Sequence, residues 1–256
     1  MQALLDTHAL LWWLDGYKRL SELARDFIGG QGIGSYLLAK FVKPKVDPLG
    51  PGNALILSPG QLTCTAVPSA SRSTFLAGSP TLGGYLGMSN GGGMMQLRNA
   101  GFDHLVVLGQ SPRPVYLKIT DDQVAILDAH HLWGKDTVET AQAIWTDFGD
   151  HFEVAAIGPA GENLVRHAAI VGNGYIAWGR TGLGAVMGSK NLKAIVVRGS
   201  SKRLPMAGAK DLNKMARAGA KGLADNDSME DLKMHGTAGV LSYQHAVGGL
   251  PTFNWD

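Results

Sequence analysis

A glycine-rich run from Gly179 to Asn191 carries the residue types that could bind a phosphorylated or otherwise anionic, polar ligand. Its glycines let the backbone approach a large ligand closely, and Arg180 offers a rigid fork of hydrogen-bond donors. A helix is predicted to begin inside the run, and free N–H groups at a helix N-terminus favour anions. Because a strand-like stretch follows at 194–199, the spacing predicts an anion-binding loop at the edge of a sheet.

Two common nucleotide-binding patterns come close to this run without matching it. In Gly188-Ser189-Lys190 the lysine is displaced from the place that a P-loop gives it. The spacing from Gly182 through Gly184 to Gly188 is one residue longer than a dinucleotide fingerprint, and no carboxylate follows where a ribose would bind. Nucleotide binding therefore stays an alternative, as does a glycine-rich helix that packs on a sheet and binds nothing.

Other candidate residues each admit a chemical and a structural interpretation. Arg72 opens a predicted strand and could clamp a phosphate or form a surface ion pair. Asn90 lies in a second glycine-rich loop and could ligate a hard cation or shape a turn. Glu162 lies in a third tight loop and could act as an acid or base, or as a structural acceptor. The adjacent His130 and His131 lack the spacing of metal ligands.

The composition restricts the class of protein. A chain of 256 residues with 45% hydrophobic residues can bury a sizeable core, in one large domain or two small ones. Its 35 glycines are dispersed among apolar residues, which indicates tight turns and close backbone approaches. A net charge of +2 argues against a nucleic-acid surface, and neither a membrane span nor an export signal is evident. The single cysteine, Cys64, excludes an internal disulfide and favours a reducing, cytoplasmic compartment.

The elements that must position these residues alternate irregularly, which predicts an α+β fold with a β-rich middle. A hairpin is expected around the turn 120–123, and Asp136 and Glu139 have the spacing of a capping box that opens a helix running to about Phe148. The other predicted strands are 54–58, 73–77, 105–109, 154–157 and 165–171, and the other predicted helices are 22–27, 35–41, 210–223 and 236–247.

Several short blocks, taken together in chain order, resemble the N-terminal domain of the aldehyde:ferredoxin oxidoreductases, which carry tungsten or molybdenum on two pterin dithiolenes. The resemblance runs from about residue 22 to the last residue. It implies an atypical segment at 1–21, a β-rich pterin-binding domain at 22–205 and the truncated start of a helical domain at 206–256. The blocks that carry it are 27–34, 71–72, 89–92, 100–103, 131–137, 157–163, 179–195, 235–239 and 249–254.

The resemblance also implies roles for individual residues. Arginines would meet the pterin phosphates, and two oxygen ligands would hold the Mg²⁺ that bridges those phosphates. Concentrated negative charge would thus face guanidinium groups, a divalent cation and helix N–H groups. The arginines would be Arg72 and Arg180, the oxygen ligands Asn90 and the backbone carbonyl of Thr181, and the backbone contacts to the pterins would come from Gly92, Leu183 and Gly184.

In the family that the chain resembles, an aldehyde is oxidised to a carboxylate and electrons pass through a [4Fe–4S] cluster to ferredoxin. Such a cluster takes four thiolates and this chain has one cysteine, so the chain is interpreted as the front portion of an enzyme, inactive alone. A non-catalytic split-gene fragment that needs a C-terminal partner chain stays the alternative, and a homodimer is left open. Gln31 and Trp178 depart from the family pattern, and Trp178 is expected to crowd the loop before Arg180.

Residues 1–20 resemble a different family. Asp6 matches the first metal-binding carboxylate of a PIN-type ribonuclease, but no matching carboxylates follow along the chain. The segment is therefore interpreted as an apolar N-terminal element, with a nuclease as the competing hypothesis.

Overall fold

The computed structural model describes residues 2–4, 30–121, 123–200, 209–226 and 229–250. The chain divides into two units, one formed by Met1–Thr65 with Ser69–Pro205 and the other by Ala66–Pro68 with Met206–Asp256. Asp6 and the helix expected over 22–27 lie outside the described residues. The larger unit combines two sheets with helices, so the fold is α+β as the sequence predicts.

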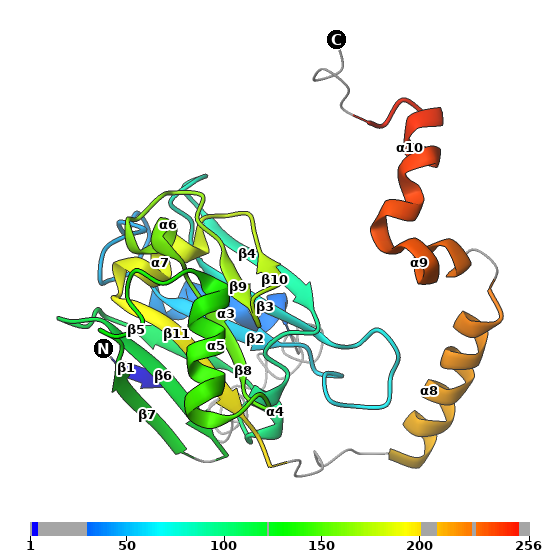
Figure 1. Ribbon diagram of the computed structural model, residues 1–256, viewed down its shortest axis with the longest axis horizontal. Helices are drawn as coiled ribbons and strands as arrows, with labels where there is room; N and C mark the ends of the chain where they lie inside the picture. The colour runs from blue at the N-terminus through cyan, green and yellow to red at the C-terminus, as the bar shows by residue number, and fades with distance from the viewer. Residues whose placement is uncertain (1, 5–29, 122, 201–208, 227–228, 251–256) are drawn as a thin grey trace. The chain divides into compact units, whose positions relative to one another are not determined.

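The first sheet has the strand order β1-β5-β2-β3-β4, and every neighbouring pair is antiparallel (Figure 1). Its strand β2 (Leu55–Pro59) is buried along its whole length, because Leu55 and Leu57 pack in one hydrophobic cluster and Ile56 packs in another. Helix α3 (Gln31–Phe41) covers one face, where Leu38 packs in one cluster with Ile56 and Leu76. The remaining strands are β1 (Gln2–Leu4), β3 (Arg72–Gly78), β4 (Tyr85–Gly91) and β5 (Leu105–Leu108).

The second sheet is mixed, with the order β10-β9-β8-β11-β6-β7. Strand β11 (Leu192–Arg198) runs parallel to β6 and antiparallel to β8. Helix α5 (Thr137–Phe148) packs Ala141 and Ile144 against one face. The other strands are β6 (Val115–Thr120), β7 (Gln123–Asp128), β8 (Glu153–Ala156), β9 (Ile170–Gly172) and β10 (Ile176–Trp178).

The facing sides of the two sheets share one hydrophobic core. Phe75 of β3 and Leu117 of β6 belong to the same buried cluster. Helix α7 (Leu183–Ser189) is buried along its whole length and contacts strands of both sheets. Two short helices, α4 (Gln96–Asn99) and α6 (Pro159–Glu162), lie in the connections. The helical part of the glycine-rich run identified from the sequence is therefore part of the core.

Local sequence signals account for several elements. The capping box at Asp136 is confirmed, because Asp136 Oδ1 accepts hydrogen bonds from Val138 N and Glu139 N at 2.8 Å and Glu139 Oε2 accepts one from Asp136 N at 2.9 Å. The hairpin of β6 and β7 is confirmed as well, with Thr120 paired to Gln123.

Two local predictions are wrong. The strand expected over 165–171 is confined to β9 (Ile170–Gly172), and the residues before it form a loop that is exposed at 165–167. The glycine-rich stretch interpreted as a loop contains β4 (Tyr85–Gly91), which pairs with β3 along its whole length. Long-range pairing thus overrides the weak strand propensity of glycine.

The smaller unit contains helices α8 (Ala209–Ala224), α9 (Glu230–His235) and α10 (Leu241–Ala246), with a 3₁₀ helix at Gly236–Val240. The helix predicted over 210–223 is confirmed, whereas the 3₁₀ segment occupies the first part of the one predicted over 236–247. Within its described residues only Ala216 is buried. None of the helices in the described ranges combines the length and apolar character that crossing a membrane requires.

Candidate functional site

Trp178 anchors the segment that leads to Arg180. Its side chain is fully buried, its Nε1 donates a hydrogen bond to Ser73 O at 3.1 Å, and its ring meets Phe75 edge to face at 4.9 Å between ring centres. Gly93 and Gly172 make room for it, since an added Cβ at either would come within 3.0 Å of the indole. The expectation that Trp178 crowds the loop is wrong, because the indole fills the core beneath the loop.

Asn90 lies where β4 meets this segment. It pairs with Ser73 across the ladder, and its Nδ2 donates a hydrogen bond to Ala177 O at 2.5 Å. Its Oδ1 has no hydrogen-bond donor among the residues that the structure describes. Gly92 adopts a φ of 80° and its N–H donates to Ser71 O at 2.9 Å, which leaves its carbonyl for any ligand. The amide oxygen of Asn90 is therefore free to coordinate a cation.

The two arginines belong to segments that these contacts connect. Arg72 begins β3 and pairs with Gly91, the neighbour of Asn90. Arg180 follows Ala177 by three residues, and both arginine side chains are exposed. Neither forms an ion pair with any acid in the described ranges, so the surface ion pair considered for Arg72 is not found there. Two arginines without an ion-pair partner in the described ranges thus belong to the two segments that the contact between Asn90 and Ala177 joins.

The backbone after Arg180 is strained and tightly enclosed. Thr181, a β-branched residue, has a φ of 79°, and its carbonyl accepts a hydrogen bond from Ser79 Oγ at 2.7 Å. Such a conformation in a β-branched residue is an outlier that persists only when the surroundings impose it. Gly182 follows with a φ of 75°, where an added Cβ would collide with the carbonyl of Arg166. The fold therefore fixes the direction of the Thr181 carbonyl.

Only part of the predicted helix N-terminus keeps an unused backbone donor. The N–H of Gly184 donates to Ala168 O at 2.9 Å, so its amide is already used. The N–H of Leu183 has no acceptor within the described ranges. Of these two residues, Leu183 has the unused backbone donor, and the residue is fully buried.

Glu162 is a structural acceptor. Its Oε1 lies 2.5 Å from Lys193 Nζ, with the two side chains 5% and 0% exposed. Both carboxylate oxygens accept the Gly134 N–H at 3.0 Å, and Lys193 Nζ also donates to Lys135 O at 2.6 Å. Burial lowers the pKa of Lys193, and Glu162 partly offsets this effect. The catalytic interpretation of Glu162 is therefore wrong, because the carboxylate holds the loop at 134–135.

Buried titratable groups were missed from the sequence. Lys190 is fully buried, and its Nζ donates to Asn53 O at 2.5 Å and to Gly109 O at 3.0 Å. Burial lowers its pKa to about 8. Since this ammonium is enclosed in the core, it cannot act as a P-loop lysine, in agreement with its displaced position in the sequence. Glu153 accepts a hydrogen bond from Gln96 N at 2.8 Å, and burial raises its pKa to about 7.

The remaining side chains suggested by the sequence stay apart. His130 pairs with Asp128, with Nδ1 and Oδ2 separated by 2.8 Å at the surface. Cys64 donates to Met95 O at 3.2 Å, and burial, followed by the charge of Glu153, raises the pKa of its thiol. No group of three or more His, Cys, Asp or Glu side chains that could hold a metal ion occurs in the described ranges.

Comparison with known proteins shows the family to which the chain belongs. Residues 16–199 match the family model described as aldehyde ferredoxin oxidoreductase, N-terminal domain. The chain is 46% identical over 239 residues to a tungsten-containing aldehyde ferredoxin oxidoreductase of Thermococcus kodakarensis. The aligned region covers 91% of this chain and 39% of the relative. The chain belongs to the aldehyde ferredoxin oxidoreductase family.

Other members and a solved structure extend this result. A tungsten-containing aldehyde ferredoxin oxidoreductase of Pyrococcus furiosus is 43% identical over 239 residues, again with 91% of this chain and 39% of the relative covered. The solved active-site complex BamBC of benzoyl coenzyme A reductase with 1,5-dienoyl-CoA gives a TM-score of 0.76 at 37% identity, covering 79% of this chain and 31% of that chain. The chain thus spans about two fifths of the length of its curated aldehyde ferredoxin oxidoreductase relatives.

Proposed function

We propose that this chain is the cofactor-binding portion of an aldehyde ferredoxin oxidoreductase-like enzyme, and that the group it binds is a tungsten bis-pterin with bridging Mg²⁺. The observation that carries the proposal is the contact between Asn90 and Ala177, which joins the segment that contains Arg180 to the strand pair that contains Arg72. These groups fit an anionic cofactor, because guanidinium forks and a hard cation both bind phosphate oxygens. The names of the relatives support tungsten.

In this proposal each residue of the chain has a defined task. Arg72 and Arg180 bind the phosphates of the cofactor, and the Asn90 amide oxygen and the Thr181 carbonyl hold Mg²⁺. The carbonyl of Gly92 and the N–H of Leu183 orient the pterins, with Gly184 packed beneath them. The bound cofactor would supply the oxygen-transfer and redox chemistry, while the protein positions it.

The oxidation of an aldehyde to a carboxylate, with electron transfer to ferredoxin, is proposed for the complete enzyme rather than for this chain. A [4Fe–4S] cluster takes four thiolates, whereas the chain has one cysteine, so other polypeptide must supply the cluster. We expect the purified 256-residue chain to show no aldehyde-dependent reduction of a viologen dye. A measurable turnover with that chain alone would contradict this division of tasks.

Cofactor binding can be tested through tungsten content. The chain, expressed with tungstate in a host that makes molybdopterin, should retain tungsten and a pterin that fluoresces after oxidation. Asn90→Ala should lose most of both, whereas Asn163→Ala should not, because Asn163 is an exposed amide that only donates to Pro159 O. A wild-type chain without tungsten, or equal loss in both variants, would contradict the proposal.

A second candidate is a non-catalytic fragment that needs a partner chain, and one observation favours it. Met215, Met234 and Tyr243 of the smaller unit are 72%, 72% and 66% exposed. Large apolar side chains left exposed on all three helices of this unit would gain stability by packing against further polypeptide. We propose that this unit begins a helical domain completed by polypeptide equivalent to the uncovered part of the relatives. Met215→Glu with Met234→Glu should abolish copurification with that part of the Thermococcus relative, and Lys221→Glu should not.

A further inference from the structure

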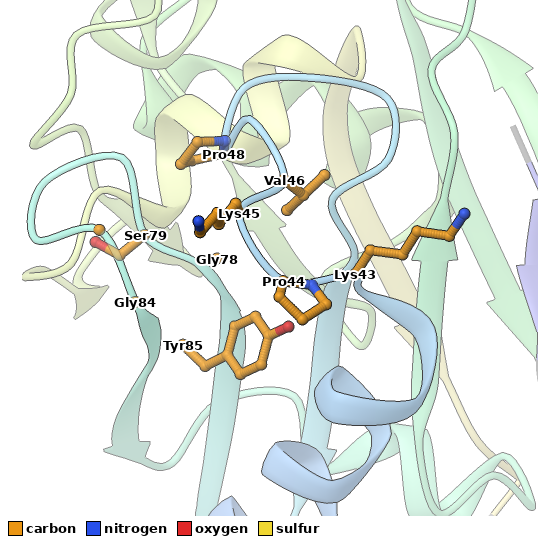
Figure 2. Close-up of a pocket in the computed structure, with 10 residues that line it drawn as sticks. Lys43, Pro44, Lys45, Val46, Pro48, Gly78, Ser79, Gly84 and Tyr85 are labelled. Atoms are coloured by element: carbon orange, nitrogen blue, oxygen red, sulfur yellow. The ribbon is translucent and has the colours of Figure 1, made fainter.

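A pocket of about 520 Å³ opens between the loop that follows α3 and the connection from β3 to β4 (Figure 2). Its volume falls within the range of about 300–1,000 Å³ that small-molecule sites occupy. The walls are mainly apolar, with contributions from Pro44, Val46, Pro48 and the ring of Tyr85. The pocket can therefore cover the hydrocarbon body of a ligand.

The two walls are tied to each other, so the pocket is formed in advance. Tyr85 Oη donates a hydrogen bond to Val42 O at 2.7 Å. The buried side chain of Asn53 donates to Pro48 O at 2.7 Å and to Gly78 O at 2.9 Å, and it accepts the Gly78 N–H at 2.9 Å. A preformed pocket loses little freedom when a ligand enters, which favours binding.

Two exposed lysines, Lys43 and Lys45, line the pocket, and they differ in the direction of their ammonium groups. Lys45 lines the pocket and has a φ of 60°, a strained conformation for a residue other than glycine. Figure 2 shows its ammonium among the lining residues, whereas the ammonium of Lys43 points away from them. Neither lysine forms an ion pair within the ranges that the structure describes. The site thus offers one uncompensated positive charge beside an apolar surface.

We propose that this pocket binds a small organic monocarboxylate with an apolar body, held by Lys45 at its carboxylate. A single cation favours one anionic group, and a charge-assisted hydrogen bond to a carboxylate is stronger than one to a neutral acceptor. The apolar walls disfavour phosphates and sugars, whose many polar groups would be left without partners. The ligand chemistry is therefore that of a short fatty acid or an aromatic acid.

The pocket is connected to the loop after Arg180. Ser79 lines the pocket, and its Oγ donates the hydrogen bond of 2.7 Å to the carbonyl of Thr181. A ligand that displaces Ser79 therefore acts on the Thr181 carbonyl. Binding of the carboxylate does not depend on the proposed cofactor, so a failure of either proposal leaves the other unaffected.

The test titrates the full chain with hexanoate and with its neutral isostere hexanamide, following backbone amide shifts by NMR. We expect hexanoate to shift the amides of Gly83, Gly84 and Tyr85 with a dissociation constant of about 1 mM or tighter. Hexanamide should bind at least about tenfold more weakly, because it lacks the charge. No response to hexanoate, or shifts centred elsewhere, would overturn the proposal.

A matched pair of variants isolates the cation. Lys45→Gln should weaken hexanoate binding about tenfold, whereas Lys43→Gln should change it by less than about twofold. Unchanged amide spectra away from the pocket show that both variants fold. Equal affinity of Lys45→Gln and wild type, or equal binding of hexanoate and hexanamide, would show that the pocket recognises only apolar surface, and the proposal would fail.

Discussion

Lys190 is predicted to make the protein more stable as the pH rises above neutrality. Its ammonium is fully buried and contacts two carbonyls, and burial lowers its pKa from 10.5 to about 8. Between these values the unfolded chain keeps the proton that the folded chain has lost, so stability increases with pH. At about 1.4 kcal/mol per pKa unit, the full effect is about 3 kcal/mol. Lys193 acts in the same direction, because burial lowers its pKa as well.

Urea unfolding followed by tryptophan fluorescence between pH 7 and pH 10 measures this effect. Wild type should gain about 2–3 kcal/mol over this range, and Lys190→Met should lose most of the gain. The exposed Lys221→Met serves as the control and should keep it. The slope is the decisive quantity, because Lys190→Met also leaves Asn53 O and Gly109 O without a donor at every pH. A wild-type curve without a rise, or a Lys190→Met curve as steep as wild type, would refute the reasoning.

Three further variants test other parts of the structure. Thr181→Gly should raise the free energy of unfolding by up to about 1 kcal/mol, because glycine tolerates the φ of 79°. A lower urea concentration at the midpoint of unfolding would contradict this prediction. Glu162→Gln should lower the free energy of unfolding by about 3–5 kcal/mol, because the buried Lys193 charge loses its partner. Adding Lys193→Met should restore part of this loss, whereas additive losses from the two substitutions would show that the two side chains do not stabilise each other. The native state keeps the Glu153 proton up to about pH 7, whereas the unfolded chain releases it near 4.5, so this group lowers stability as pH rises between those values. The stability of Glu153→Gln relative to wild type should therefore grow by about 3 kcal/mol from pH 4.5 to pH 7, and a constant difference would show that Glu153 titrates normally.

Local signals in the sequence were sufficient wherever neighbouring residues decide the structure. Asp136 and Glu139 form a capping box, and both partners lie within one turn of the helix. The stretch Gly83–Gly93 could not be interpreted in this way, since β4 forms only because β3 supplies its hydrogen-bond partners. Its Gly87 matches the partner strand closely, because an added Cβ would come within 3.0 Å of Leu76.

The candidate site was likewise predicted only where the signal lies within a short stretch of sequence. Arginine and asparagine in glycine-rich loops indicated an anion site, but the contact from Asn90 to Ala177 joins residues far apart in the chain. The buried positions of Lys190 and Lys193 could not be predicted either, because lysine is almost always exposed. Their partners are carbonyls of Asn53, Gly109 and Lys135, which carry no recognisable sequence signal.

Cofactor retention by an Arg72→Ala, Arg180→Ala double variant tests the central claim most directly. The chain is expressed with tungstate in a host that makes molybdopterin, and tungsten and pterin are measured per mole of purified protein. Loss of both guanidinium groups should reduce retention at least about tenfold, because a guanidinium group forms strong charge-assisted hydrogen bonds to phosphate. The exposed Arg113→Ala should retain as much as wild type. Wild-type retention in the folded double variant would contradict the claim that these two arginines bind the cofactor.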